Sequence, residues 1–301
     1  MRRAPWTGCG TALVTPFAAT GAVDEAALRR LVHRQIAAGV HFLVPCGTTG
    51  ESPTLTAHER RRVVEMVVEE AGGRVPVLAG AGGYNTEEVI DAGVEMRRAG
   101  ADGLLSVTPY YNKPTQEGLF QHYQALAGRT GLPIIVYNVP GRTGCNVEVA
   151  TLARIAAIPG IVGVKEASGN MTQMCEVCRA VPDAFVVLAG DDALTLPLMA
   201  VGGRGVISVA SNEAPAEMAA LVEAAEAGDF ATARARHARL LPLMQINFVE
   251  SNPIPVKAAM AMMGLIEERY RLPLVALQPE SRARLAAVLQ AQGLLSTADA
   301  A

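Results

Sequence analysis

The chain has 301 residues, which is enough for one large α/β domain with an appendage, and half of its residues are apolar while 18% are charged. No apolar run is long enough to cross a bilayer, so we expect no membrane insertion. The formal net charge is −3, and the 26 basic residues are scattered among 29 acidic ones, which excludes the basic face of a typical nucleic-acid-binding protein.

The cysteines and the N-terminal residues indicate in which cellular compartment the protein folds. Five cysteines, an odd number spread widely along the chain, suit a reducing cytosol better than a disulfide framework. Residues 1–6 include two arginines, but no apolar segment of a signal peptide follows them. We therefore expect a cytoplasmic protein.

Short apolar runs alternate with longer amphipathic segments over the first two thirds of the chain. This alternation is typical of βα units and a parallel sheet. We expect strands at eight runs: residues 11–15, 42–45, 75–79, 103–107, 133–137, 161–165, 185–188 and 205–209. Eight such strands with helices between them predict an α/β fold of the closed (β/α)8 TIM barrel type rather than an open doubly wound sheet.

Several local signals mark turns and helix ends. Residues 24–38 have apolar side chains at helical spacing, and Gly39 is placed to end that helix. A second helix begins at Thr56, where Thr-Ala-His-Glu forms a capping box. We interpret the glycines of residues 8–10 as a turn before the first strand. Residues 80–83 are also glycine-rich but lack the spacing of a nucleotide-binding loop, so they predict a tight strand-to-helix turn and no nucleotide cofactor.

The strand-like runs stop after Pro215. Helical segments follow at residues 216–227, 230–240, 252–263 and 279–292. We therefore expect two parts, a (β/α)8 barrel over residues 1–228 and a C-terminal helical domain over residues 229–301.

Lys165 ends the sixth apolar run and is one of three lysines in the chain. An ammonium at the inner end of a buried strand is costly unless it is paired or neutralised. Such a lysine can act as an amine nucleophile that forms a Schiff base with a carbonyl group. The alternative is a structural lysine that reaches water or forms an ion pair with Glu166.

Further polar residues follow the carboxyl ends of neighbouring strands, where the reacting groups of (β/α)8 barrels lie. The amides and hydroxyls of Thr48 and Thr49 can bind a carboxylate. Tyr137 can pass protons if its phenol is positioned by Thr48, and Arg142 can bind a second carboxylate. Each residue alone could be structural, but their arrangement around one lysine favours an active site.

We expect no metal site. Cys175 and Cys178 form a single CxxC motif without a second pair or a nearby histidine, and His58-Glu59 is followed by Arg62 where a zinc-binding HExxH motif requires histidine. We assign the acidic pair Asp191 and Asp192 to a helix start or another structural role.

Five motifs stand in order along the chain: Gly-Thr-Thr-Gly-Glu-Ser at 47–52, Tyr-Tyr-Asn at 110–112, Tyr-Asn-Val-Pro-Gly-Arg-Thr-Gly at 137–144, Val-Lys-Glu-Ala-Ser-Gly at 164–169 and Gly-Val-Ile-Ser at 205–208. Together with Asn-Pro-Ile-Pro-Val-Lys at 252–257, they make the sequence resemble the dihydrodipicolinate synthase (4-hydroxy-tetrahydrodipicolinate synthase) family. This family belongs to the pyruvate-dependent class I aldolase superfamily, and the resemblance covers nearly the whole chain.

The resemblance implies a Schiff-base-forming lyase that condenses pyruvate with L-aspartate 4-semialdehyde to 4-hydroxy-tetrahydrodipicolinate, a step of lysine and diaminopimelate biosynthesis. Lys165 would bind pyruvate covalently, so no cofactor would be needed. The resemblance also implies that Tyr137, Thr48 and Tyr111 form a proton relay. Thr49 would help to bind the carboxylate of pyruvate, and Arg142 would bind the carboxylate of the semialdehyde. The main chain of Gly190 and Ile207 would line the pocket. Tyr111 would come from a neighbouring subunit, which implies at least a dimer and usually a homotetramer built as a dimer of dimers.

The resemblance also points to a possible effector site. Ser52, Glu88 and Tyr110 match family members that lysine inhibits, whereas Ala57, Arg60 and Tyr84 stand where those members have two histidines and an asparagine. The guanidinium of Arg60 would repel a lysine ammonium. We therefore expect weak or absent inhibition by lysine.

Two other functions stay open at this point. A 2-keto-3-deoxy sugar acid or N-acetylneuraminate aldolase would keep the Schiff base, but its substrates call for hydroxyl recognition where Arg142 offers a cation. A non-catalytic barrel that serves as a binding module would require a missing lysine or an occluded pocket.

Overall fold

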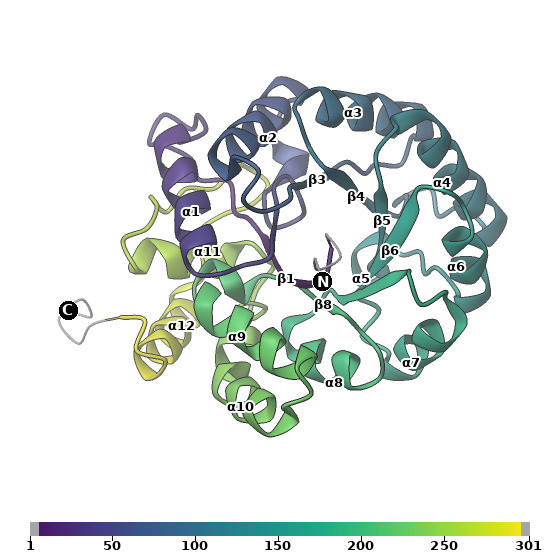
Figure 1. The fold of residues 1–301 in the computed structure, drawn as a ribbon. Coiled ribbons are helices and arrows are strands. Elements are labelled where there is room, and N and C mark those ends of the chain that lie inside the picture. Colours follow the sequence, from purple (N-terminus) through teal and green to yellow (C-terminus); the bar gives the residue numbers. More distant parts are fainter. Residues whose placement is uncertain (1–5, 296–301) are drawn as a thin grey trace.

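The computed structural model describes residues 6–295, so the expectation for the N-terminal stretch falls mainly outside the described residues. In this part, eight parallel strands form the sheet order β2-β1-β8-β7-β6-β5-β4-β3, and a bridge between Leu43 and Val77 joins its two ends (Figure 1). The strands are β1 (Gly8–Ala12), β2 (Phe42–Val44), β3 (Leu78–Gly80), β4 (Gly103–Val107), β5 (Ile134–Asn138), β6 (Ile161–Glu166), β7 (Val186–Ala189) and β8 (Gly205–Ser208). The predicted (β/α)8 barrel is confirmed.

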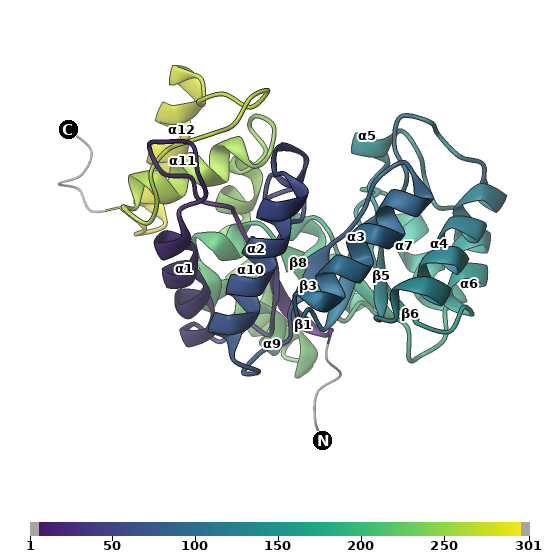
Figure 2. The same ribbon diagram turned by 90° about the horizontal axis from the view of Figure 1, so that it is seen from above.

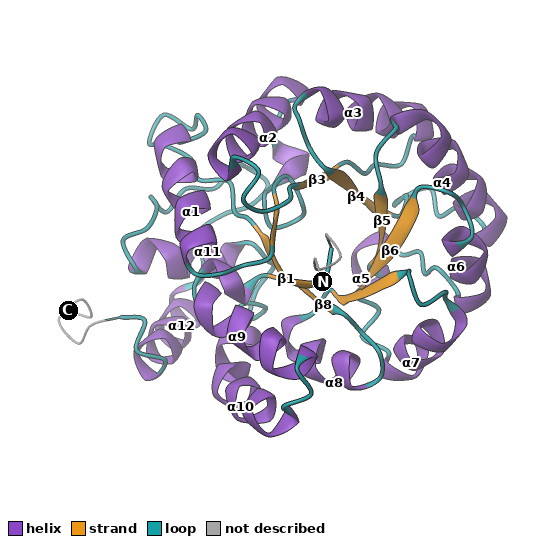
Figure 3. Cartoon of the chain, viewed as in Figure 1, coloured by secondary structure: helices purple, strands orange, loops and turns teal. Residues whose placement is uncertain are grey.

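Helices surround this barrel as an outer ring (Figure 3). They are α1 (Glu25–Ala37), α2 (Ala57–Ala71), α3 (Thr86–Arg98), α4 (Gln116–Thr130), α6 (Val149–Ala156), α7 (Met171–Ala180), α8 (Thr195–Ala200) and α9 (Pro215–Glu226). The short helix α5 (Pro140–Thr143) lies inside the ring (Figure 3), and 3-10 turns occur at η1 (Ser52–Thr54), η2 (Asp192–Leu194) and η3 (Ala210–Asn212). Apolar side chains between the strands and this ring form the main core, and a second cluster fills the barrel interior. No helix of residues 6–295 has the length and apolar character needed to cross a membrane.

The prediction for the first strand is wrong, because β1 covers residues 8–12 rather than 11–15. Its glycines pair with neighbouring strands instead of forming a turn. A Cβ on Gly10 would lie 2.1 Å from the ring of Phe42, and one on Gly205 would lie 1.9 Å from the carbonyl oxygen of Gly8. These glycines therefore allow close packing where β1, β2 and β8 meet.

The local signals predicted for the ends of α1 and for the start of α2 agree with the structure. The side chain of Asp24 accepts a hydrogen bond from the amide of Ala27 and caps α1, which is followed by Gly39 at φ +84°. Thr56 and Glu59 form the expected capping box at the start of α2. The predicted strand-to-helix turn at 80–83 begins at the last residue of β3 and leads toward α3.

The C-terminal segment is helical, with α10 (Phe230–Ile246), α11 (Ile254–Met262) and α12 (Pro279–Ala291). Helix α10 is longer than the predicted 230–240, because it continues through Pro242 instead of ending before it. Figure 2 shows α11 and α12 together at one side of the barrel, above α1. The division into domains at residues 228 and 229 stays a prediction, since α10 packs directly against α9.

Candidate active site

Lys165 and Tyr137 lie side by side, because they are direct partners in the register of the neighbouring strands β6 and β5. Both side chains are buried, with 5% and 6% of their surface exposed. The Nζ atom of Lys165 lies 4.3 Å from the centroid of the Tyr137 ring. The amine thus stands against an aromatic face near the carboxyl ends of the strands, the place where barrel enzymes carry their reacting groups.

Glu166 does not neutralise Lys165, so the ion-pair alternative is wrong for the described residues. Successive side chains of a strand point to opposite faces, which turns Glu166 away from its neighbour. Its carboxylate accepts hydrogen bonds from Asn138 Nδ2 at 3.0 Å and from the amide of Ser168 at 2.7 Å. Lys165 remains directed into the cavity as an amine without an anionic partner in residues 6–295.

Gly190 leaves the space that the Lys165 side chain occupies. A Cβ at this position would lie 3.1 Å from both Cγ and Cε of Lys165 and 2.6 Å from the Cβ of Ala167. Gly190 also lines the cavity around the lysine. Ile207 is 1% exposed and packs in the barrel interior, and it does not line either of the cavities described below.

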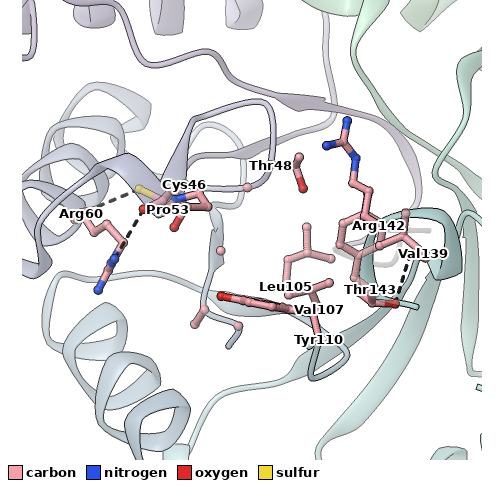
Figure 4. A pocket seen from close by; sticks show the side chains of 16 residues that line it. Cys46, Thr48, Pro53, Arg60, Leu105, Val107, Tyr110, Val139, Arg142 and Thr143 are labelled. Atoms are coloured by element: carbon pink, nitrogen blue, oxygen red, sulfur yellow. Dashed lines mark hydrogen bonds between the residues drawn. The ribbon is translucent and has the colours of Figure 1, made fainter. Parts of the chain in front are cut away.

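Two adjoining cavities open at this end of the barrel. The smaller has a volume of about 120 Å³ and is lined by Lys165, Tyr137, Thr48, Thr49, Arg142, Gly190, Ala167, Val139, Asp191, Val209, Phe248 and Asn252. The larger has a volume of about 260 Å³ and shares Thr48, Tyr137, Val139 and Arg142 with it (Figure 4). Six of the predicted site residues therefore meet around one small cavity: Lys165, Tyr137, Thr48, Thr49, Arg142 and Gly190.

Thr48 and Thr49 lie in the loop that follows β2. Thr49 is 2% exposed, and its Oγ1 accepts a hydrogen bond from Asn252 Nδ2 at 3.0 Å. Neither threonine amide donates a hydrogen bond within residues 6–295. Thr48 and Tyr137 face the same cavity, but no hydrogen bond joins them in this part of the chain, so the predicted positioning of the phenol by Thr48 stays a prediction.

Arg142 belongs to the short helix α5, which Pro140 begins and Gly144 ends at φ +66°. Its side chain is largely exposed and extends along the cavity wall opposite Thr48 (Figure 4). One guanidinium nitrogen, Nη2, donates a hydrogen bond to the carbonyl oxygen of Asn252 at 3.2 Å. The remaining donors are available to a ligand carboxylate.

Tyr111 lies away from Lys165 and lines neither cavity. Its side chain is 89% exposed, and its backbone adopts a left-handed conformation with φ +69°. The predicted role of Tyr111 in a neighbouring subunit stays a prediction.

The residues of the possible effector site are divided between the larger cavity and the surface. Ser52, Arg60 and Tyr110 line the cavity, and Arg60 Nη1 donates hydrogen bonds to the carbonyl oxygens of Leu55 at 3.0 Å and Ser52 at 3.4 Å. Tyr84 packs edge-on against Tyr110, with 5.3 Å between the ring centroids. Glu88 accepts a hydrogen bond from Asn85, and Ala57 begins α2.

Asp191 and Asp192 have the structural roles expected of them. Asp191 caps η2 by accepting a hydrogen bond from the amide of Ala193 at 2.9 Å. Asp192 is buried and accepts hydrogen bonds from the amides of Val209 and Ala210. Burial raises the pKa of Asp192 above its usual range, although these hydrogen bonds oppose the shift.

The cysteine motif lies on α7, where Cys175 is exposed and Cys178 is half-buried. No group of three or more potential metal ligands occurs in the part of the chain that the structure describes.

Sequence reasoning missed two cavity residues, Phe248 and Asn252, and the partner of Lys257. Asn252 is separated from Thr49 by 203 residues, and Lys257 forms a buried ion pair with Glu51 across 206 residues. The Asn-Pro-Ile-Pro-Val-Lys motif could have drawn attention to these residues. Its contacts, however, depend on how the C-terminal helices pack, which hydrophobic periodicity does not indicate.

Comparisons with known proteins agree over nearly the full length. The sequence matches the Dihydrodipicolinate synthetase family over residues 5–292. It is 54% identical over 295 residues to a 4-hydroxy-tetrahydrodipicolinate synthase of Koribacter versatilis, and this match covers 98% of each chain. It is 53% identical over 297 residues to a 4-hydroxy-tetrahydrodipicolinate synthase of Chlorobium phaeobacteroides, and this match covers 98% of this chain and all of the relative.

Solved structures show the same similarity. The crystal structure of a dihydrodipicolinate synthase from Aquifex aeolicus superposes with a TM-score of 0.95 at 44% identity, covering 97% of this chain and 100% of that one. A chloride-inhibited dihydrodipicolinate synthase from Acinetobacter baumannii, complexed with pyruvate, gives a TM-score of 0.95 at 42% identity and covers 96% and 99% of the two chains.

Proposed function

The chain belongs to the dihydrodipicolinate synthetase family, and we propose that Lys165 is the residue through which it performs the reaction of that family. It has 4-hydroxy-tetrahydrodipicolinate synthase activity, a lyase reaction of lysine and diaminopimelate biosynthesis that uses pyruvate. The second substrate is L-aspartate 4-semialdehyde. What the residues around Lys165 do in this reaction is inferred from their geometry.

The reaction begins with the addition of the Lys165 amine to the keto carbon of pyruvate. Loss of water gives an imine, and loss of a methyl proton turns it into an enamine. The enamine carbon attacks the aldehyde carbon of the semialdehyde, whose oxygen takes up a proton and becomes the product hydroxyl. The semialdehyde amine then attacks the imine carbon, closes the ring and releases the lysine amine. No cofactor takes part, because the covalent bond to the lysine supplies the electron sink.

Each neighbour of Lys165 has a role that fits its position. The amides and hydroxyls of Thr48 and Thr49 bind the pyruvate carboxylate in the smaller cavity. Tyr137, Thr48 and Tyr111 pass the protons, and Arg142 binds the carboxylate of the semialdehyde at the junction with the larger cavity. The main chain at Gly190 borders the pyruvate site. Ile207 lines neither cavity and has no part in this proposal.

The observation that carries this proposal is the buried amine of Lys165, 4.3 Å from the Tyr137 ring centroid, in a cavity of about 120 Å³. The side chain of Lys165 faces this cavity, so its amine can reach the keto carbon of a bound pyruvate. A cavity of this size suits a three-carbon acid, whereas the second substrate requires the adjoining space.

Reductive trapping tests the proposal. Borohydride added with pyruvate should leave a reduced adduct on Lys165, detected by peptide mass spectrometry. The Lys165→Arg variant should give no adduct, while the exposed Lys113→Arg variant, the matched control, should give as much as the unchanged protein. An adduct at another lysine, or none with pyruvate present, would overturn the assignment.

The proposal extends to the assembly and its location. Tyr111 is exposed on the free subunit, so its part in the proton relay requires a second copy of the chain, and we propose a homotetramer built as a dimer of dimers. A cytoplasmic location agrees with the cysteine usage.

A further inference from the structure

Glu51 and Lys257 form an ion pair that is fully buried, with both side chains at 0% exposure. Lys257 Nζ donates a hydrogen bond to Glu51 Oε1 and lies 4.3 Å from the centroid of the Phe17 ring and 5.4 Å from that of Tyr270. Desolvation lowers the pKa of Lys257, while the nearby carboxylate of Glu51 opposes this shift. Because burying two charges costs free energy, such a pair contributes little to stability compared with apolar residues of the same size.

The pair lies immediately beside the loop of Thr48 and Thr49. Glu51 follows Gly50 in sequence, and its backbone has φ +54°. Cys46, on the other side of the loop, has φ +56°. Left-handed backbone is uncommon for residues other than glycine and persists only where the surroundings fix it. The loop is therefore held between two unfavourable backbone conformations.

Contacts from the C-terminal segment hold this loop from behind. Lys257 on α11 binds the Glu51 carboxylate, and Asn252 Nδ2 donates to Thr49 Oγ1 at 3.0 Å. Arg271 Nη1 donates to the carbonyl oxygen of Thr54 at 2.9 Å. The barrel side contributes one further bond, from Thr15 Oγ1 to the carbonyl oxygen of Gly50 at 2.7 Å.

We infer that Lys257 and Glu51 are positioning residues, and that their ion pair fixes the loop in the conformation in which Thr48 and Thr49 receive the carboxylate of pyruvate. The inference rests on the role proposed for these threonines. Neither Lys257 nor Glu51 lines the cavities, so the pair acts through the loop and not by contact with the substrate.

A double variant, Lys257→Met with Glu51→Gln, tests the inference. It removes both charges and keeps the side-chain volumes nearly unchanged, so no unpaired charge is left in the core. In this variant the carboxylate of pyruvate would lose roughly one charged hydrogen bond to the loop. We therefore expect the pyruvate concentration for half-maximal borohydride trapping on Lys165 to rise about tenfold. The KM for pyruvate should rise by the same factor. The KM for the semialdehyde should change less than about twofold, because Arg142 lies on α5 and not on this loop.

The matched control is Arg236→Met with Glu217→Gln, which removes a partly exposed ion pair between α10 and α9. It should leave the pyruvate dependence of trapping unchanged. If Lys257 and Glu51 are only structural, the double variant will melt at a lower temperature but will show the original pyruvate dependence below that temperature. This result would overturn the inference.

A milder variant covers the case in which the double variant does not fold. Glu51→Asp keeps the carboxylate that pairs with Lys257 but shortens the side chain by one methylene, so we expect a rise of about threefold in half-saturating pyruvate. A folded Glu51→Asp variant with unchanged pyruvate dependence contradicts the inference. Absence of trapping at Lys165 in the unchanged protein would instead contradict the proposed function.

Discussion

The amine of Lys165 and the ring of Tyr137 are in contact because β5 and β6 pair these two residues directly, with 4.3 Å between Nζ and the ring centroid. The lysine amine thus lies over the aromatic face, and both residues line the same cavity. We propose two functions for the tyrosine: its ring packs against the amine, and its hydroxyl passes protons.

The Tyr137→Phe variant separates these functions. It keeps the ring and removes the hydroxyl, so we expect normal folding and a kcat lowered by about 10²- to 10⁴-fold, the usual effect of losing a general acid or base. Steady-state assays and a thermal melt measure the two quantities. A kcat within about threefold of the original value would show that the hydroxyl passes no proton in the slow step.

Arg142→Ala tests the second carboxylate site. The KM for L-aspartate 4-semialdehyde should rise about 10- to 100-fold, because a charge-assisted hydrogen-bond pair to its carboxylate is lost. Trapping of pyruvate on Lys165 should persist. Arg129→Ala, which removes an exposed arginine paired with Glu87 on the outside of the barrel, serves as the control and should leave both values unchanged.

Subunit mixing tests whether Tyr111 completes the site of another subunit. Tyr111→Phe and Lys165→Ala homo-oligomers should both have little activity. Mixed oligomers should regain a substantial part of it, because a subunit with an intact Lys165 receives an intact Tyr111 from its neighbour. Mixing Tyr137→Phe with Lys165→Ala is the control, since these residues belong to the same site and no complete site can form. Equal activity of the two mixtures would contradict a shared site.

The local part of the fold and site could be predicted from the sequence, because it depends on neighbouring residues. The capping box at Thr56, the strand of Lys165 and the strand-to-helix turn at 80–83 all follow from patterns a few residues long. The barrel rule then places the ends of consecutive strands together, and this brings Tyr137 next to Lys165 without further information.

The features that sequence reasoning missed depend on packing between distant segments. Gly10 resembles a turn residue in sequence, but its missing side chain makes room for the ring of Phe42. Lys257 lies in a helical pattern, and nothing near it in sequence shows that its amine contacts Glu51, 206 residues away. Long-range contacts of this kind fix the shape of the loop around Thr48, whereas local patterns fix only its existence.

Lysine should inhibit this enzyme weakly or not at all. Arg60 lines the larger cavity beside Ser52 and Tyr110, and its guanidinium would repel the ammonium groups of lysine. Steady-state rates measured with up to submillimolar lysine should stay unchanged. Clear inhibition in this range would show that Arg60 moves away or that lysine binds elsewhere.

His122 should make stability fall as the pH drops below neutrality. Its side chain is 4% exposed and its Nδ1 lies 2.9 Å from Thr86 Oγ1, while its Nε2 has no hydrogen-bond partner in residues 6–295. Burial lowers the pKa of His122 from 6.5 to about 4. Between these values the unfolded chain binds a proton that the folded chain does not, so the stability present above pH 6.5 is lost as the pH falls toward 4. From pH 7 to pH 5, the loss attributable to His122 should be roughly 2 kcal/mol in the free energy of unfolding.

Denaturant unfolding at pH 7 and pH 5 measures this loss. In His122→Gln the decrease between the two pH values should be smaller by roughly 2 kcal/mol, because glutamine does not titrate. His58→Gln, which replaces an exposed histidine on α2, should retain the full decrease of the unchanged protein. If His122→Gln loses as much stability as the His58→Gln control, the acid sensitivity comes from other groups.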